Sequence, residues 1–481
     1  MTVVRISDDA LATACGADQM ADAFAAAGCT VERVSSWGMH WLEPLVEIGG
    51  IGFGPASPAD VPAILSGACD KCIGAIAEHP FIAHQQRLTF ARAGKTRPLS
   101  LEDYAVTGGW AGLTRARSLS PEQLIEEVTQ SGLRGRGGAG FPAGIKWQTV
   151  ANAPGAQKYV VCNADEGDSG TFADRMLMEG DPFQLIEGLA IAAHAVGASR
   201  GYIYVRSEYP HAIAKLNTAL DLAAKLIAPL VIEVRVGAGA YVCGEETSML
   251  NSIEGKRGEV RAKPPLPALE GLFGCPTVVN NVLTFAAIPH ILIEGGAALY
   301  DSHGIARSKG TMPIQLAGNI KHGGLYETAF GITLRELIYD VGGGTASGRP
   351  VKAVQVGGPL GAYLAPGQFD IPFDYEAYTV ADALIGHGGI VVFDDSADMG
   401  AMARFAFEFC AAESCGKCTP CRIGAVRGVE LIDRLGTGGA PAREALEDLC
   451  ETMKFGSLCA LGGFTPYPVL SALKHWPEDF T

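Results

Sequence analysis

The feature that most constrains this chain is a run of three closely spaced cysteines. Cys415, Cys418 and Cys421 follow one another in the sequence ESCGKCTPCR. A C-x2-C-x2-C spacing lets three thiolates surround one face of a cuboidal iron–sulfur cluster, whereas a zinc knuckle usually takes two separated cysteine pairs. The run therefore predicts a [4Fe–4S] cluster and favours it over a structural zinc site.

A [4Fe–4S] cluster needs a fourth ligand from another part of the chain. Cys459, in GSLCALG, is the best candidate, and Cys410 and Cys450 are its competitors. Iron–sulfur clusters carry single electrons. The cysteines therefore indicate an electron-transfer protein.

Length and charge exclude several classes of protein. A chain of 481 residues is expected to form about three or four domains. It has no run of the ~20 apolar residues that span a bilayer, and the N-terminus MTVVRISDDA lacks the pattern of a secretory signal. Thirteen cysteines without such a signal indicate reduced thiols and a cytoplasmic location. The net charge of −15 argues against nucleic-acid or anionic membrane partners.

Residues 1–90 are predicted to form a small α/β unit. Strands are expected at TVVRIS, TVERVSSWG and WLEPLVEI, with one Ala-rich helix at DDALATACGADQMADAFAAAG. Cys69 and Cys72 stand in C-x-x-C spacing, which resembles a thioredoxin-like domain and suggests a redox dithiol or part of a [2Fe–2S] site. Ferredoxins of that fold need four clustered cysteines, and Cys15 and Cys29 stand alone. We therefore expect this unit to bind no cluster and to dock a partner subunit.

A glycine-rich loop follows a predicted helix. Ser120 is a good N-cap and Pro121 suits the first turn of a helix that leads into GLRGRGGAGFPAGIKW. Gly135, Gly137 and Gly140 formally match G-x-G-x-x-G. A Rossmann fingerprint requires a strand before these glycines, so the match to that motif is spurious.

The same loop still has the chemistry of a ligand site. Glycines let a flat ring and backbone N–H groups approach closely. Arg134, Arg136 and Lys146 bring positive charge for a phosphate. A merely flexible loop is the alternative.

An acidic loop follows the predicted buried strand KYVVC. Asn163, Asp165, Glu166 and Asp168 lie beyond the carboxyl end of that strand, where α/β sheets place their ligands. Carboxylates at such a place suit the hydroxyl groups of a ribityl chain or a ribose. A cation site and a solvated acidic turn are the alternatives.

A third glycine-rich passage, IEVRVGAGAYVCGEETSMLNSIEG, also follows a strand. Its helix is expected to begin near Glu245 and to end at Gly255, with N–H groups at the start that favour an anion or a ring carbonyl. The run KRGEVRAKPPLP adds four cations, and Asn280 and Asn281 offer amides for helix capping or ligand binding.

Taken in order, these passages resemble the flavin-bearing, NADH-binding subunit family. The resemblance rests on GLRGRGGAGFPAGIKW, CNADEGDSGTF, GAGAYVCGEETSMLNSIEGKRG, CPTVVNN and ESCGKCTPCR, and it covers roughly residues 110–480. The family includes the flavoprotein of respiratory complex I and the diaphorase subunits of NAD-reducing hydrogenases and of NAD-dependent formate dehydrogenases. The resemblance implies FMN, a [4Fe–4S] cluster and NAD(H) as the substrate.

The resemblance also implies a multidomain fold of the α/β and α+β classes. The expected parts are a thioredoxin-like domain at 1–90, a connector at 91–118, a Rossmann-like FMN- and NAD-binding domain at 119–311, a ubiquitin-like β-grasp (SLBB) domain at 312–365, a second connector at 366–399 and a helical [4Fe–4S] bundle at 400–481.

Site residues follow from the resemblance position by position. The implied FMN contacts are Gly135, Arg136, Gly137, Gly138, Lys146, Asn163, Asp165, Glu166, Tyr241, Gly244, Glu245, Asn280, Asn281 and Thr284. The implied NAD(H) contacts are Ala139, Phe141, Asp168, Glu246 and Lys263. The implied cluster ligands are Cys415, Cys418, Cys421 and Cys459. FMN performs the hydride transfer, so no side chain is expected to act as an acid or base.

Two departures from the family pattern narrow the interpretation. The family usually reads DEGEPG where this chain has Asp168 and Ser169, and KPPFP where it has Leu266. These departures and the N-terminal unit resemble the β subunit of soluble molybdenum- or tungsten-dependent formate dehydrogenases. The implied partners are an α subunit with the metal and iron–sulfur clusters and a small [2Fe–2S] γ subunit. A hydrogenase or complex I flavoprotein is the alternative, and a flavin-free cluster scaffold is a third. Carboxylates near Glu246 are expected to favour NAD(H) over NADP(H).

Overall fold

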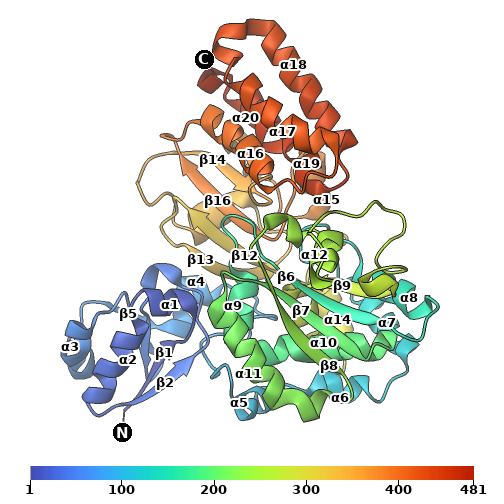
Figure 1. Cartoon of the computed structure of the whole chain (residues 1–481). Helices are drawn as coiled ribbons and strands as arrows, with labels where there is room; N and C mark the ends of the chain where they lie inside the picture. The colour runs from blue at the N-terminus through green and yellow to red at the C-terminus, as the bar shows by residue number, and fades with distance from the viewer. Residues whose placement is uncertain (1, 481) are drawn as a thin grey trace.

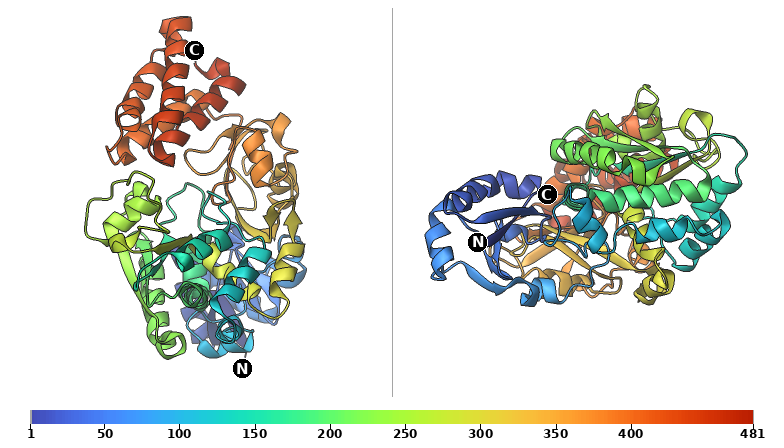
Figure 2. Two further views of the ribbon diagram at one scale, coloured as in Figure 1. Left: turned by 90° about the vertical axis from the view of Figure 1, so that its right-hand side faces the viewer. Right: turned by 90° about the horizontal axis from the view of Figure 1, so that it is seen from below.

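The computed structural model describes residues 2–480, and all of their side chains except those of residues 437 and 438. Figure 1 shows a small α/β unit at the N-terminus in blue, a larger α/β part in cyan and green, a second sheet in orange and a group of helices at the C-terminus in red. The N-terminal unit and the C-terminal helices lie at opposite ends of the molecule (Figure 2, left). The chain is thus a mixed α/β protein of several sheets.

The N-terminal unit is built on a five-stranded sheet of order β2-β1-β3-β4-β5. Its strands are β1 (Val3–Ser7), β2 (Thr30–Val34), β3 (Val46–Ile48), β4 (Ile51–Phe53) and β5 (Cys72–Ala75), and its helices are α1 (Ala10–Ala14), α2 (Ala17–Ala26), α3 (Val61–Ser66) and α4 (Pro80–Ala83). The Ala-rich segment, predicted as one helix, is two helices, because Gly16 between them has a left-handed φ of 107°. Of WLEPLVEI only β3 is a strand, since residues 40–42 form a single tight turn and Pro44 has no N–H to donate.

The larger α/β part contains a parallel sheet of order β8-β7-β6-β9. Its strands are β6 (Tyr159–Ala164), β7 (Arg200–Arg206), β8 (Val231–Gly237) and β9 (Thr277–Asn281). Its helices are α5 (Leu101–Val106), α6 (Ala111–Ala116), α7 (Pro121–Gln130), α8 (Ala143–Asn152), α9 (Ala173–Gly180), α10 (Pro182–Val196), α11 (Pro210–Ile227), α12 (Glu246–Ile253), α13 (Val282–Ile291) and α14 (Gly296–Ser302). Helix α10 is almost entirely buried, as expected for a helix inside a layered α/β core.

A second five-stranded sheet lies between the α/β part and the C-terminal helices (Figure 1). Its order is β13-β12-β16-β14-β15, with β12 (Thr311–Gly318), β13 (Gly324–Ala329), β14 (Val351–Val356), β15 (Tyr363–Leu364) and β16 (Gly389–Asp394). A short hairpin, β10 (Gly304–Ile305) and β11 (Ser308–Lys309), precedes it, and α15 (Tyr375–Val380) lies between β15 and β16. The central strand β16 comes from the segment 366–399, which the sequence suggested as a connector.

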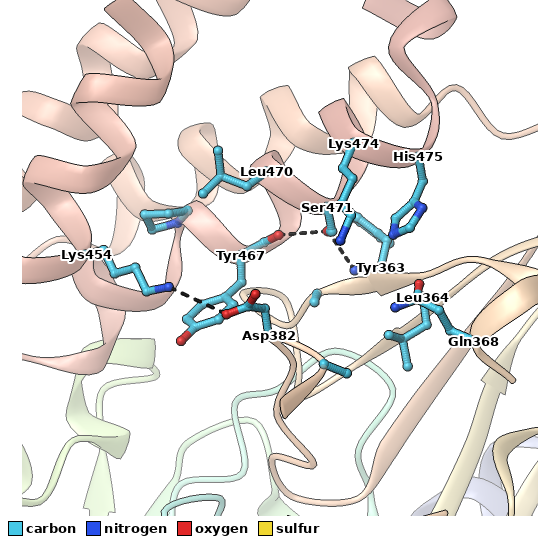
Figure 3. A pocket seen from close by; sticks show the side chains of 13 residues that line it. Tyr363, Leu364, Gln368, Asp382, Lys454, Tyr467, Leu470, Ser471, Lys474 and His475 are labelled. Carbon is cyan, nitrogen blue, oxygen red and sulfur yellow. Dashed lines mark hydrogen bonds and ion pairs between the residues drawn. The ribbon is translucent and has the colours of Figure 1, made fainter. Parts of the chain in front are cut away.

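The C-terminal helices are α16 (Met399–Glu413), α17 (Thr419–Ile432), α18 (Leu435–Gly456), α19 (Ala460–Phe464) and α20 (Pro466–His475). Helix α20 docks on the edge strand β15 through Ser471, whose hydroxyl accepts the N–H of Tyr363 at 2.9 Å and donates to the carbonyl of Tyr467 at 2.7 Å. A crevice of about 140 Å³ lies beside this contact (Figure 3), and Lys454 and Asp382 face each other across it at 4.0 Å. It contains none of the residues expected to bind a cofactor. These contacts fix the helices to the second sheet.

Among the described residues, no helix has the length and apolar character that crossing a membrane requires.

Candidate functional site

The glycine-rich loop is closed on itself. An isolated bridge joins Arg134 to Pro142, and the N–H of Gly135 donates to the carbonyl of Phe141 at 2.8 Å. Gly138 has a left-handed φ of 108°, and a side chain at Gly137 would meet the β-carbon of Asn281 at 3.0 Å. The loop is therefore a formed turn packed against the end of β9.

The side chain of Arg136 anchors this loop. Its guanidinium is buried and donates to the hydroxyl of Tyr300 at 2.7 Å and to the carbonyl of Lys309 at 2.6 Å. It also lies 4.8 Å from the ring centre of Phe330. Its backbone N–H donates to the hydroxyl of Thr284 at 2.9 Å. These contacts occupy the guanidinium, which is therefore not available to a phosphate.

The acidic loop contains a carboxylate, that of Asp165, with an oxygen that is free to accept a hydrogen bond from a ligand. Asp165 is buried, and its Oδ2 has no hydrogen-bond partner among the described residues. Burial raises the pKa of Asp165 to about 7. A side chain at Gly244 would lie 3.3 Å from that oxygen, and the amide of Asn163 donates to the carbonyl of Gly244 at 2.7 Å. The glycine keeps open the space that Asp165 faces.

The carboxylate of Glu166 makes hydrogen bonds within the fold instead. Its two oxygens accept the N–H groups of Asp174 and Arg175 at 2.8 Å each, at the start of α9. Its backbone has a φ of 31°, which is uncommon outside glycine. The carboxylate therefore holds the acidic loop on α9.

A buried histidine joins two of the loops. His387 precedes β16, and its Nδ1 lies 2.8 Å from the carbonyl of Arg136 while its Nε2 lies 3.1 Å from Asp174 and 3.6 Å from Glu166. Burial lowers the pKa of His387, but the two carboxylates outweigh that effect and leave its pKa well above 6.5. The amide of Asn281 donates to Asp174 at 2.6 Å. A protonated His387 thus connects the glycine-rich loop to α9.

The third glycine-rich passage ends in a capped helix. The carboxylate of Glu245 accepts the N–H of Thr247 at 2.8 Å and that of Ser248 at 2.9 Å at the start of α12. Lys263 lies 3.0 Å from Glu245 and 2.7 Å from Glu246. The predicted start of this helix is confirmed. The start of α12 therefore carries two carboxylates, and Lys263 compensates their negative charge.

Lys146 lies in the same neighbourhood. Its Nζ donates to the carbonyl of Val279 at 2.8 Å and lies 3.9 Å from Glu246. Burial lowers its pKa. Two of its three donors remain for an anion, because only one is used by the carbonyl.

Asp168 is held at the boundary with the second sheet. The hydroxyl of Tyr241 donates to its Oδ1 at 2.7 Å, and burial raises the pKa of Asp168. A side chain at Gly358 would overlap the Asp168 carboxylate, at 2.4 Å from its Cγ. The loop after β14 therefore covers the acidic loop closely.

The sequence-predicted residues come together at the carboxyl edge of the parallel sheet, as expected for an α/β ligand site. Gly137, Ala139 and Phe141 are exposed along the rim, and Phe141 is 49% exposed. Asn280 is buried and accepts the indole N–H of Trp147 at 3.0 Å. The exposed glycine-rich loop and the unpartnered Oδ2 of Asp165 offer backbone N–H groups and a hydrogen-bond acceptor, a donor and acceptor set that fits FMN.

The cysteine run lies at the start of a helix. Cys418 is the N-cap of α17 and Cys421 is in its first turn, while Cys459 is the N-cap of α19. Helix N-termini stabilise thiolates and other negative charge. All of these cysteines and Cys415 are free thiols. The donor set fits an anionic iron–sulfur cluster.

Helix α19 packs against α17 at these cysteines. A side chain at Gly462 would lie 2.7 Å from the β-carbon of Cys421, so only glycine fits there. This contact brings the start of α19, which carries Cys459, against Cys421. Cys450 is buried in α18 and, among the described residues, makes no hydrogen bond to Cys415, Cys418, Cys421 or Cys459.

The loop at Tyr241 and the segment that carries the cysteine run are in contact. The backbone N–H of Tyr241 donates to the carboxylate of Glu413 at 2.9 Å, just before the cysteine run. The guanidinium of Arg257 donates to the carbonyl of Cys415 at 3.2 Å. Burial raises the pKa of Cys459, and the carboxylate of Glu245 at the start of α12 raises it further. Two-electron and one-electron centres would thus be neighbours in one chain.

Sequence reasoning missed several residues of this site. His387 and Gly358 were not singled out by any motif, Asp174 lies two residues beyond CNADEGDSGTF and was not singled out, and Glu413 contacts Tyr241 only because the fold brings the two together. The nearest signal was the repeated glycine in IGHGG around His387.

Known families match two parts of the chain. The profile of the Nuo51 FMN-binding domain matches residues 128–290, and that of the NADH-ubiquinone oxidoreductase-F iron-sulfur binding region matches residues 401–481. The chain is 45% identical over 408 residues to the NADP-reducing hydrogenase subunit HndC of Solidesulfovibrio fructosivorans, covering 82% of this chain and 83% of that protein. It is 44% identical over 393 residues to an NADH-quinone oxidoreductase subunit of Rhizobium meliloti, covering 79% of this chain and 93% of that protein. A crystal structure of an NAD⁺-reducing [NiFe]-hydrogenase in the H2-reduced state superposes with a TM-score of 0.73 at 30% identity, over 100% of this chain and 83% of that one.

Proposed function

The chain belongs to the family of NADH-oxidising flavoprotein subunits found in NADH-quinone oxidoreductases, and from that premise we propose that it is the diaphorase (β) subunit of an NAD-dependent formate dehydrogenase. The family role itself is that of an NADH dehydrogenase module with FMN, a [4Fe–4S] cluster and NADH as the substrate. When bound, FMN exchanges hydride with NAD(H) and single electrons with the cluster.

In this proposal, residues of this chain bind FMN, NAD(H) and the cluster and orient them. Asp165 accepts hydroxyl groups of the ribityl chain, and Lys146 and the backbone of the glycine-rich loop receive the phosphate. Phe141 and Lys263 lie on the exposed rim, where NAD(H) enters. Cys415, Cys418, Cys421 and Cys459 hold the cluster. The observation that carries the diaphorase role is the direct contact between the loop at Tyr241 and the cysteine segment at Glu413.

The formate partner is supported by the sequence departures. Asp168 and Leu266 stand where the family usually has Glu and an aromatic residue, a pattern similar to the formate dehydrogenase branch. We assign to the partners a molybdenum- or tungsten-containing α subunit with iron–sulfur clusters and a [2Fe–2S] γ subunit, all in the cytoplasm. The N-terminal unit is assigned a thioredoxin-like fold without a cluster, the second sheet a β-grasp fold and the C-terminal helices the [4Fe–4S] bundle.

A hydrogenase diaphorase is the second candidate. The solved NAD⁺-reducing hydrogenase chain aligns with the whole of this chain, including the N-terminal unit, and that observation favours it. The solved hydrogenase is a [NiFe] enzyme, whereas the proposed formate dehydrogenase contains molybdenum or tungsten in its partner subunit.

One experiment separates the two candidates. The native complex is purified anaerobically, and NAD⁺ reduction is measured with formate and with hydrogen alongside metal analysis. Formate-dependent NADH formation with molybdenum or tungsten is the expected result. Hydrogen-dependent NADH formation without formate-dependent activity, and without molybdenum or tungsten, would replace the formate proposal with the hydrogenase candidate.

A further inference from the structure

A fifth cysteine contacts the cluster site. Cys410, at the C-terminal turn of α16, is fully buried, and its sulfur lies 3.7 Å from the sulfur of Cys421. The hydroxyl oxygen of Ser414, the C-cap of α16, lies 3.2 Å from the same sulfur. Cys421 therefore has two potential donors from one helix end, and neither belongs to the C-x2-C-x2-C run.

The surrounding hydrogen bonds direct both protons toward Cys421. The hydroxyl of Ser414 already accepts the N–H of Gly416 at 3.3 Å, which leaves its own proton to donate. The carbonyl of Leu461 lies 3.8 Å from Cys410, but it accepts the hydroxyl of Thr465 at 2.7 Å. A thiolate bound to iron is a stronger acceptor than a neutral carbonyl, so the thiol of Cys410 donates to Cys421.

The distance between the sulfurs of Cys410 and Cys421 also indicates that Cys410 is a hydrogen-bond donor and not a cluster ligand. The four ligands of a cuboidal cluster sit at different corners, so their sulfurs stand apart rather than in contact. Cys410 and Cys421 are at the distance of a sulfur hydrogen bond. Cys459, at the N-cap of α19, supplies the fourth corner from the opposite helix.

We propose that Cys410 and Ser414 are positioning residues that hydrogen-bond the Cys421 sulfur and raise the reduction potential of the [4Fe–4S] cluster. The inference rests on the proposed assignment of Cys421 as a ligand. Reduction adds a negative charge to the cluster, and donors to its sulfurs stabilise that charge, which raises the potential. The cluster then accepts electrons from the neighbouring flavin more readily.

The test is an EPR-monitored redox titration of the native complex, with iron and FMN content measured in each variant. The variants are Cys410→Ala, Ser414→Ala and both together, with Ser414→Thr to keep a hydroxyl. Cys450→Ala is the matched control, since it removes another buried thiol of the same bundle. The single variants are expected to keep full iron and to titrate at a lower midpoint potential, and the double variant to shift by about the sum of the two. Ser414→Thr and Cys450→Ala should titrate like the wild type.

An unchanged midpoint potential in Cys410→Ala would overturn the proposal, and so would loss of the cluster in a variant that retains FMN, because Cys410 would then be a ligand. If Cys410→Ala fails to fold, Ser414→Ala at the half-buried helix end decides: a lower potential supports the proposal and an unchanged one overturns it. Cys421→Ala must lose the cluster. If it keeps the cluster, the ligand assignment fails independently of the hydrogen bonds.

Discussion

At the scale of single residues, the side chains expected at the flavin divide into two groups. Asp165 and Lys146 have hydrogen-bonding groups left for a ligand. The guanidinium of Arg136 is instead bound to Tyr300, and the carboxylate of Glu166 to the start of α9. The sequence indicated which residue types gather there, because motif spacing reports composition. It did not indicate which way each side chain points, because that depends on partners distant in the chain.

Replacing Cys418 by Ser should remove the cluster and leave the flavin. Cys418 caps α17 and lies outside the predicted flavin loops, so NADH oxidation with ferricyanide should persist while the proposed formate–NAD⁺ coupling is lost. Iron content, the EPR signal and both activities are measured. Cys459→Ala should behave likewise, and Cys450→Ala should not. Full iron in Cys418→Ser would contradict the ligand assignment.

His387 should make FMN binding sensitive to alkaline pH. Its pKa is raised above 6.5 in the folded protein by Asp174 and Glu166, in spite of burial, and Asp168 also lies in its electric field. Its stabilising effect is therefore fully present below 6.5 and is lost as the pH rises through the raised pKa. FMN affinity, followed by fluorescence, should fall on that alkaline side.

His387→Gln is the matching variant. It should bind FMN more weakly at neutral pH and lose the alkaline fall, because no imidazolium remains to titrate. If FMN affinity falls equally at alkaline pH in the variant and in the wild type, a group other than His387 causes the fall.

Coenzyme selection should depend on Lys263 more than on Glu246. The carboxylate of Glu246 is balanced by Lys263 at 2.7 Å and by Lys146 at 3.9 Å, so its repulsion of a 2′-phosphate is reduced. We expect Glu246→Gln to change the NADPH/NADH ratio of kcat/KM by less than about tenfold, and Lys263→Met to lower it by about tenfold or ~1.4 kcal/mol. Lys256→Met, which removes an exposed lysine that pairs with the buried carboxylate of Glu254, is the control. If Lys263→Met and Lys256→Met change the NADPH/NADH ratio equally, coenzyme selectivity does not depend on Lys263.

At the scale of elements, caps and strands were predictable where the signal is local. Ser120 caps α7 as expected, β6 forms at KYVVC, and Asn281 caps α13. The break at Gly16 and the central position of β16 were not predicted. A left-handed glycine can end a helix or lie outside one, and the pairing of β16 between β12 and β14 is a long-range contact without a sequence signal.

The N-terminal unit should stabilise the second sheet. Trp37, Met39 and Phe81 share a buried core with Ile314 and Tyr326 of β12 and β13. Trp37→Ala should therefore cost about 3–5 kcal/mol and increase hydrogen exchange in β12 and β13. Removing residues 1–90 should lower the melting temperature of the rest and weaken FMN retention.

Phe24→Ala is the control for that prediction. Phe24 is equally buried but belongs to the separate core of the N-terminal unit. It should increase exchange in β1 and β2 while β12 and β13 stay protected. Equal protection of β12 and β13 in Trp37→Ala would show that the shared core contributes little.

At the scale of the whole molecule, the fold brings two kinds of redox site together. The parallel sheet supplies the loops predicted to bind the flavin, the C-terminal helices supply the cysteines, and the second sheet lies between them (Figure 1). His387, before β16, contacts the glycine-rich loop and α9, and Gly358, after β14, lies against Asp168. The motifs predicted both sites, but the contact between Tyr241 and Glu413 depends on how distant segments dock.

The most direct test of this account is the response of the native complex to NADH under anaerobic conditions. The complex and its Cys418→Ser variant are mixed with NADH, and flavin absorbance and low-temperature EPR spectra are recorded. The account predicts that flavin bleaches in both samples and that one reduced [4Fe–4S] signal forms in the wild type and is missing in the variant. Bleaching of the flavin with identical EPR spectra in the two samples would contradict it, because electrons would then bypass the cysteines beside the flavin site.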